Sequence, residues 1–215
     1  MGSEQAQEPS HSRGGYGEPD SALRARLDAL CDEGWAVFER FDREVRDRRF
    51  HPFVAADYEL VLAALLEHRR PALRFLEWGS ASGVITIMAD LLGYEACGIE
   101  IDESLVATAR GLALRFESGA RFVHGSFLPS GYAFNARAPT RWTASGGAES
   151  GYMQLGRALD DFDVVFGYPW GSEEAMMLDL MRCYGQPNGL LLLFGVDSGV
   201  RGYRGGRVLR ENRSD

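Results

Sequence analysis

The sequence predicts an α/β fold in which a doubly wound, mostly parallel sheet carries helices on both faces. The main observation is the stretch over residues 73–102, which has the pattern of strand, glycine turn, helix and strand. A strand–helix–strand unit of this length forms a right-handed crossover in a parallel sheet. Further apolar runs over residues 121–123, 162–166 and 190–196 alternate with helical stretches over residues 103–117 and 173–184.

The central unit predicts a ligand site outside the carboxyl ends of its two strands. Its turn, residues 79–83, has glycine at both ends, so a ligand can approach the backbone closely. The turn also opens a helix, whose first N–H groups lack partners and point toward a ligand. Glu100 ends the second strand about 20 residues after Gly79, where a carboxylate can accept hydrogen bonds from ribose hydroxyls.

Residues 77–83, EWGSASG, resemble motif I of the class I S-adenosylmethionine-dependent methyltransferases. The resemblance implies S-adenosylmethionine as cofactor, with the turn close to its methionine part and Glu77 supporting the turn or the methionine amino group. The turn residues assigned to the cofactor are Gly79, Ser80, Ala81 and Gly83. Ala81 replaces the usual middle glycine, and we expect it to keep a negative φ. The turn lacks the Gly-x-Gly-x-x-Gly of dinucleotide-binding enzymes. A ligand-free strand–helix–strand unit and an NAD-type enzyme are the alternatives.

Residues 98–102, GIEID, look like motif II of the same family. This resemblance implies that Glu100 holds the ribose and that Ile101 lies against the adenine. After the third strand, Ser126 stands where the family commonly has an acid, so its hydroxyl and the Phe127 ring are expected beside the base. Core packing is the alternative for Phe127. We also place Gly167, at the end of the fourth strand, among the cofactor-binding residues.

Residues 167–171, GYPWG, resemble motif IV, the Asn/Asp-Pro-Pro-aromatic loop of the amine methylases. Gly167 replaces the amine-binding side chain and Tyr168 replaces the first proline, so backbone carbonyls there would have to accept the hydrogen bond from an amine. The candidate catalytic residues are Tyr168 and Trp170, which would line the acceptor pocket, and Glu173 as base. Glu174 is an alternative base, and a solvated helix start is the alternative role for both glutamates.

The chain is expected to divide into three parts. Residues 1–19 form a disordered tail, and residues 20–70 form a helical segment that packs on or caps the core. Residues 71–215 form the methyltransferase-like domain, with a loop insertion over residues 128–160 and an abbreviated C-terminal end that contains one short hairpin. The first helix, beginning at Asp20 or Ser21, packs on its own domain or serves as a lid or dimer helix. The insertion is a mobile loop near the active site or an exposed loop without a role.

The segment before motif I, FVAADYELVLAAL, is similar to one found in certain non-SET protein-lysine methyltransferases. This similarity implies that residues 53–65 fold over the cofactor, and a connector with a core aromatic is the alternative. His51 lies just before the segment and is expected at the surface or at a helix cap rather than as a base.

Composition limits the function further. The net charge of −8 does not favour nucleic acid, and three widely spaced cysteines predict neither a metal site nor disulfides. Without a signal-peptide or membrane-spanning pattern, the expected location is the cytoplasm. The predicted function is methyl transfer to an unidentified small molecule or protein side chain, and a homodimer stays open. The alternative is a non-catalytic nucleoside-binding or assembly module with the same fold.

Overall fold

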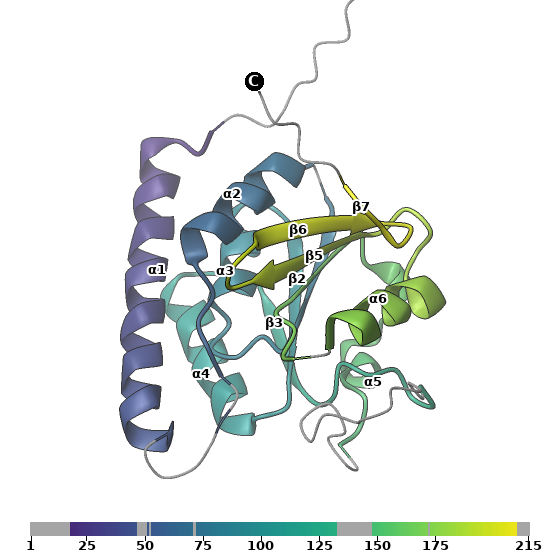
Figure 1. The fold of residues 1–215 in the computed structure, drawn as a ribbon. Coiled ribbons are helices and arrows are strands. Elements are labelled where there is room, and N and C mark those ends of the chain that lie inside the picture. The colour runs from purple at the N-terminus through teal and green to yellow at the C-terminus, as the bar shows by residue number, and fades with distance from the viewer. Residues whose placement is uncertain are drawn as a thin grey trace, which may run out of the picture.

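The computed structural model describes residues 18–46, 51, 53–70, 72–132, 148–171 and 173–209. Within them, seven strands form one sheet in the order β3-β2-β1-β4-β5-β6-β7 (Figure 1). Strands β1 to β5 are parallel, β6 is antiparallel to β5, and β7 is antiparallel to β6. The strands are β1 Arg74–Trp78, β2 Glu95–Glu100, β3 Arg121–His124, β4 Val164–Gly167, β5 Leu190–Gly195, β6 Gly199–Arg204 and β7 Arg207–Val208. The predicted mostly parallel α/β sheet is therefore confirmed.

Helices cover both faces of the sheet, so the fold is doubly wound (Figure 1). Because side chains alternate along a strand, Phe75 of β1 joins one buried cluster and its neighbour Leu76 joins the other. Helices α1 Ser21–Phe41, α2 Tyr58–His68, α3 Val84–Leu91 and α4 Glu103–Arg115 contribute to the first cluster. Helices α5 Gly151–Leu155 and α6 Glu173–Tyr184 contribute to the second.

Helix α1 packs against α3 of its own chain. Its N-cap is Asp20, whose side chain accepts a hydrogen bond from the N–H of Leu23 at 2.8 Å. Gly34 lies in the contact, where an added Cβ would come 2.7 Å from Cγ2 of Val84, the first residue of α3. The close approach therefore needs a residue without a side chain. A role for α1 as a lid or dimer helix stays a prediction.

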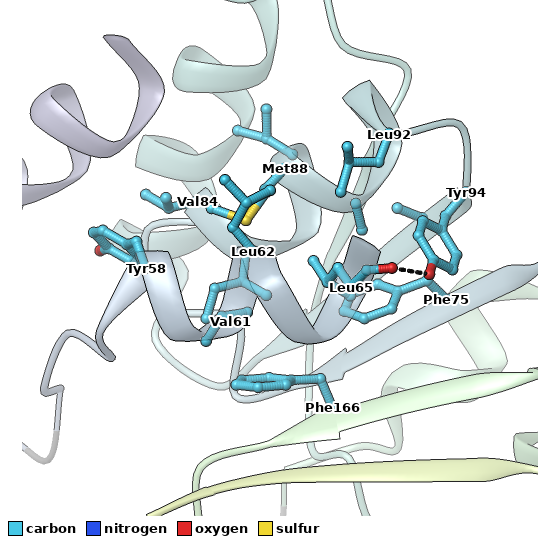
Figure 2. Packing of buried hydrophobic residues seen from close by; sticks show 14 of the residues in the cluster. Tyr58, Val61, Leu62, Leu65, Phe75, Val84, Met88, Leu92, Tyr94 and Phe166 are labelled. Atoms are coloured by element: carbon cyan, nitrogen blue, oxygen red, sulfur yellow. Dashed lines mark hydrogen bonds between the residues drawn. The ribbon is translucent and has the colours of Figure 1, made fainter. Parts of the chain in front are cut away.

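Helix α2 packs against α3 and against side chains of the sheet (Figure 2). Asp57 caps it by accepting hydrogen bonds from the N–H groups of Glu59 and Leu60. The Tyr94 hydroxyl donates to the carbonyl of Leu65 at 2.7 Å, which satisfies a polar group inside the cluster. The packed side chains are Tyr58, Val61, Leu62, Leu65, Phe75, Val84, Met88, Leu92 and Phe166.

The end of α4 differs from the prediction. The helix ends at Arg115, two residues before the end of the predicted stretch over residues 103–117, and Glu117 takes a left-handed conformation with φ of 48°. Helix α5 ends at Leu155, since Gly156 has φ of 64°, and a separate 3₁₀ turn follows at Leu159–Asp161. Helix α1 gives way to a π-helical turn, Asp42–Arg46.

The C-terminal end of the sheet is abbreviated, as predicted. Strand β5 reverses directly into β6 through residues 196–198, and no helix lies between them. The predicted hairpin around Gly205 and Gly206 is the β6–β7 pair. What the sequence did not reveal is that β6 begins at Gly199 and pairs with β5 along its whole length.

Two predicted segments fall largely outside the described residues: the tail over residues 1–19 is described only at residues 18 and 19, and the insertion lacks residues 133–147. In the part of the chain that is described, no helix has the length and apolarity needed to cross a membrane.

Candidate functional site

A cavity of about 350 Å³ lies at the carboxyl ends of β1, β2 and β4. This is the edge of the sheet where ligands of doubly wound folds bind. Most of the residues predicted for the site line this one cavity although they come from four separate parts of the chain. They are Glu77, Gly79, Ser80, Ala81, Glu100, Ile101, Phe127, Tyr168, Trp170 and Glu173.

The glycine turn is held to β2 by backbone hydrogen bonds. The N–H groups of Gly79 and Ser80 both donate to the carbonyl of Ile99, at 2.9 and 3.0 Å. Gly79 has φ of 70°, and a Cβ built on it would meet no atom within 4 Å. The turn therefore presents bare backbone to open space, which suits close approach by a ligand.

Ser80 is buried, and its Oγ has no hydrogen-bond partner among the described residues. The side chain lies over Gly98 of β2, where an added Cβ would come 2.6 Å from Oγ. A buried hydroxyl without a partner is costly, so a bound molecule that supplies a donor or acceptor here would be stabilised. This orphaned group fits the polar methionine part of the implied cofactor.

Ala81 departs from the expected conformation. Its φ is 44°, in the left-handed region, so the expectation of a negative φ was wrong. In this turn the Ala81 N–H donates to Oε2 of Glu100 at 2.8 Å. An L-residue in this region costs roughly 1–2 kcal/mol, which explains the preference for glycine at this place in motif I.

Glu100 is buried and accepts three backbone hydrogen bonds. Its Oε1 accepts from the N–H groups of Ile101 and Asp102 at 2.7 and 2.8 Å, and its Oε2 accepts from Ala81. Burial raises the pKa of the carboxyl, while the three N–H groups oppose that shift. A carboxylate has about four lone-pair sites, so roughly one remains for a ligand hydroxyl.

Glu77 is the second buried acid of the cavity. Its Oε2 accepts from the N–H of Thr86 at 3.0 Å and from the Thr86 hydroxyl. Burial raises the pKa of Glu77 to about 8, against the lowering effect of Thr86, and the nearby Glu100 charge adds to the rise. A cationic ligand beside these two carboxyls would favour their ionised forms.

Three predicted residues do not reach the cavity wall. Gly83 is packed against α4 and β3, where a Cβ would come 2.7 Å from Ala109 and Phe122. Ser126 is buried, and its Oγ accepts from the N–H of Leu128 at 3.1 Å. A side chain on Gly167 would point at Sδ of Met177, 2.9 Å away. Each position faces packed protein, so these three residues contact other parts of the fold and do not line the cavity.

Residues 51, 53–56 and 58 form a wall of the cavity. His51 Nε2 lies 3.2 Å from Oδ2 of Asp102, and its Nδ1 accepts from the N–H of Phe53 at 3.0 Å. Phe53 in turn packs edge-on against Phe38 and Phe41 of α1. The similarity of this segment to one before motif I was the only sequence signal for it, since isolated aromatic residues do not specify a wall.

The third group of lining residues lies on the loop after β4 and at the start of α6. Tyr168 packs edge-on against Phe194, with ring centroids 4.8 Å apart. The N–H of Trp170 donates to Oε2 of Glu173 at 2.9 Å. Glu174, the alternative base, is bound to Arg201 at 2.7 Å and to the Tyr203 hydroxyl at 2.8 Å. The structure therefore separates the two glutamates, and only Glu173 lines the cavity.

Fold and cavity together define the class to which this architecture belongs. The chain has the fold of the class I S-adenosylmethionine-dependent methyltransferases, with the residues of motifs I and II around one cavity. No known family model matches the sequence. A curated relative is the ribosomal protein L11 methyltransferase of Thermus thermophilus, which is 40% identical over 75 residues. That match covers 34% of this chain and 30% of the relative, so the chain spans less than a third of the relative's length.

Two of the solved structures with a similar fold are described as methyltransferases. The RNA methyltransferase of Salinibacter ruber, solved with S-adenosyl-L-homocysteine, has 19% identity and a TM-score of 0.45 over 62% of this chain and 72% of that one. The precorrin-6y C5,15-methyltransferase of Geobacter metallireducens has 16% identity and a TM-score of 0.47, over 72% of each chain. At these low values, the likenesses carry no weight for the function of this chain.

Proposed function

We propose that this protein binds S-adenosylmethionine in the cavity and transfers its methyl group to an acceptor. The observation that carries the proposal is the Glu100 carboxylate, whose hydrogen bond to Ala81 joins the end of β2 to the glycine turn. One carboxylate thus lies beside bare backbone, and this is the pair of features that an adenosyl ligand with a polar tail needs. The orphaned hydroxyl of Ser80 supports the same ligand.

The proposed roles follow from position in the cavity. Glu100 accepts a ribose hydroxyl with its remaining lone pair, and the half-exposed Ile101 side chain covers the adenine. Phe127 lines the same region, and its ring stacks on Trp78 with centroids 5.5 Å apart. Glu77 faces the methionine amino group. The cofactor supplies an activated methyl group, so the protein's main task is to align an acceptor with it.

Calorimetry with S-adenosylmethionine tests the proposal. Wild-type protein should bind, and Glu100→Ala should weaken binding tenfold or more, because one charged hydrogen bond contributes about 1.5–3 kcal/mol. Glu103→Ala, at an exposed acid of the first turn of α4, is the matched control and should bind as the wild type does. Unchanged affinity in Glu100→Ala would remove this residue from the site. Absence of binding by the wild type would refute the proposed function.

A second candidate function is a nucleoside-binding or assembly module without catalysis. The observation that favours it is the short end of the sheet, where β5 turns straight into β6 in the described part of the chain. The cavity favours catalysis instead, since its wall continues past the cofactor-binding residues to Tyr168, Trp170 and Glu173. Incubation with S-adenosylmethionine and fractions of a cell extract separates the two. Formation of S-adenosylhomocysteine supports the enzyme, and binding without any product supports the module.

A further inference from the structure

Acidic side chains predominate over basic ones in the described wall of the cavity. Among the described residues that line it, the ionisable acids are Glu77, Glu100, Asp102 and Glu173, and none is an arginine. The basic group among these described lining residues is His51, which lies against Asp102 at 3.2 Å. The chain has 23 arginines and no lysine, so the excess of acids in the described wall does not follow from a shortage of arginine in the sequence. A cavity of this charge attracts cations and repels anionic acceptors.

Glu173 is the acid that cofactor binding does not use. It lies with Tyr168 and Trp170 in the segment that follows β4, whereas the glycine turn follows the neighbouring strand β1. Its side chain is 8% exposed, and one oxygen accepts from the N–H of Trp170. Among the described residues, its Oε1 has no hydrogen bond or ion pair, so this oxygen is left for a ligand.

The neighbouring rings suit a cation as well. Tyr168 is fixed by its contact with Phe194, and Trp170 is held by the hydrogen bond to Glu173. Tyrosine and tryptophan faces attract ammonium groups, and more strongly where water is excluded. The cavity of about 350 Å³ is near the lower limit for a site that holds one drug-sized ligand. With the cofactor bound, only a slender group of the acceptor fits.

We propose that the acceptor is an alkyl amine that enters as its ammonium form between Tyr168 and Trp170, with its nitrogen on Oε1 of Glu173. This inference rests on the proposed function. Glu173 takes one proton from the ammonium group, and the freed nitrogen lone pair then forms the new C–N bond. The C–S bond breaks with its electron pair left on sulfur, so the products are a methylammonium group, a neutral thioether and protonated Glu173. Burial raises the pKa of Glu173, which favours its holding that proton.

Binding to the wild-type protein saturated with S-adenosylhomocysteine tests the inference with three probes of equal length: n-butylammonium, 1-butanol and butyrate. Butylammonium should bind at least tenfold more tightly than either of the others. Glu173→Gln should abolish this preference while it keeps the acceptor for Trp170, and Glu174→Gln, which alters a glutamate bound to Arg201, should retain it. Equal binding of the three probes by the wild type overturns the inference without any variant.

The same titration keeps the two proposals apart. If S-adenosylhomocysteine itself does not bind, the proposed function fails; if it binds and the ammonium probe shows no preference, only the acceptor class is wrong. Product assays then identify the source of the amine, with n-butylamine standing for a small molecule and the peptide Ala-Lys-Ala for a protein side chain. S-adenosylhomocysteine formed with either amine supports the inference, and failure of both amines to give product overturns it.

Discussion

Replacement of Glu77 by glutamine should change how the stability of the protein depends on pH. The folded pKa of Glu77 is about 8 because the carboxyl is buried, whereas its ordinary value is 4.5. Between these values the folded state holds a proton that the unfolded state has lost. The unfolded state therefore binds fewer protons, and the free energy of unfolding falls as the pH rises through this window.

The size of the effect follows from the width of the window. For each pH unit between the two pKa values, the free energy of unfolding falls by up to about 1.4 kcal/mol. From pH 5 to pH 8, Glu77 alone should lower the free energy of unfolding by on the order of 3 kcal/mol. Glutamine keeps an oxygen for Thr86 and does not titrate, so Glu77→Gln should remove this part of the slope and be the more stable protein at pH 8.

Urea unfolding at pH 5, 6.5 and 8 measures the effect. The buried Glu173 titrates in both proteins and cancels from the difference between wild type and variant, which therefore reports Glu77 together with the Glu100 charge that acts on it. Glu103→Gln, at an exposed acid of α4, is the control and should follow the wild type at each pH. If the free energy of unfolding of Glu77→Gln changes with pH as that of the wild type does, Glu77 is ionised in the folded protein and the reasoning is refuted.

Three further substitutions test the packing around the site by urea unfolding. Ala81→Gly should raise the free energy of unfolding by about 0.5–1 kcal/mol, since glycine relieves the left-handed strain at a smaller entropic cost; a loss of stability would contradict this. Gly83→Ala should lower it by about 1–3 kcal/mol, because the new methyl group lies 2.7 Å from Phe122, and a neutral result would mean that the ring moves freely. Tyr152→Phe should cost about 1–3 kcal/mol by leaving the buried Trp78 indole N–H, now 2.8 Å from the Tyr152 hydroxyl, without an acceptor; no change would show that water replaces it.

The fold and half of the site were predictable because their signals are local. Each apolar run, glycine turn and cap lies within a few neighbouring residues, and parallel strands place their carboxyl ends together. This is why Gly79 and Glu100, far apart in the sequence, were expected on one cavity. The same rule brings Tyr168 and Glu173 there, since β4 lies next to β1.

The remainder depends on the direction of side chains, which the sequence does not reveal. Ser126 follows β3 and Gly167 ends β4 as predicted, yet the Ser126 hydroxyl accepts from the N–H of Leu128, and a side chain at position 167 would face Met177. Ala81 shows the same limit for the backbone, because the sequence did not predict its left-handed φ. The wall formed by residues 51, 53–56 and 58 was the hardest part to predict. Its position depends on the contact of Phe53 with α1 and of His51 with Asp102, which are distant in the sequence.

The contact at Gly34 links helix α1 to the shape of the cavity, although Gly34 itself is not among the lining residues. Val84, against which this glycine lies, begins α3 and also lines the cavity. Any heavier residue at position 34 would push on that valine and, through it, on the bend that precedes the helix. The size of the cavity therefore depends partly on a residue that belongs to none of the motifs. A substitution at position 34 is expected to change which ligands fit while every motif residue stays the same.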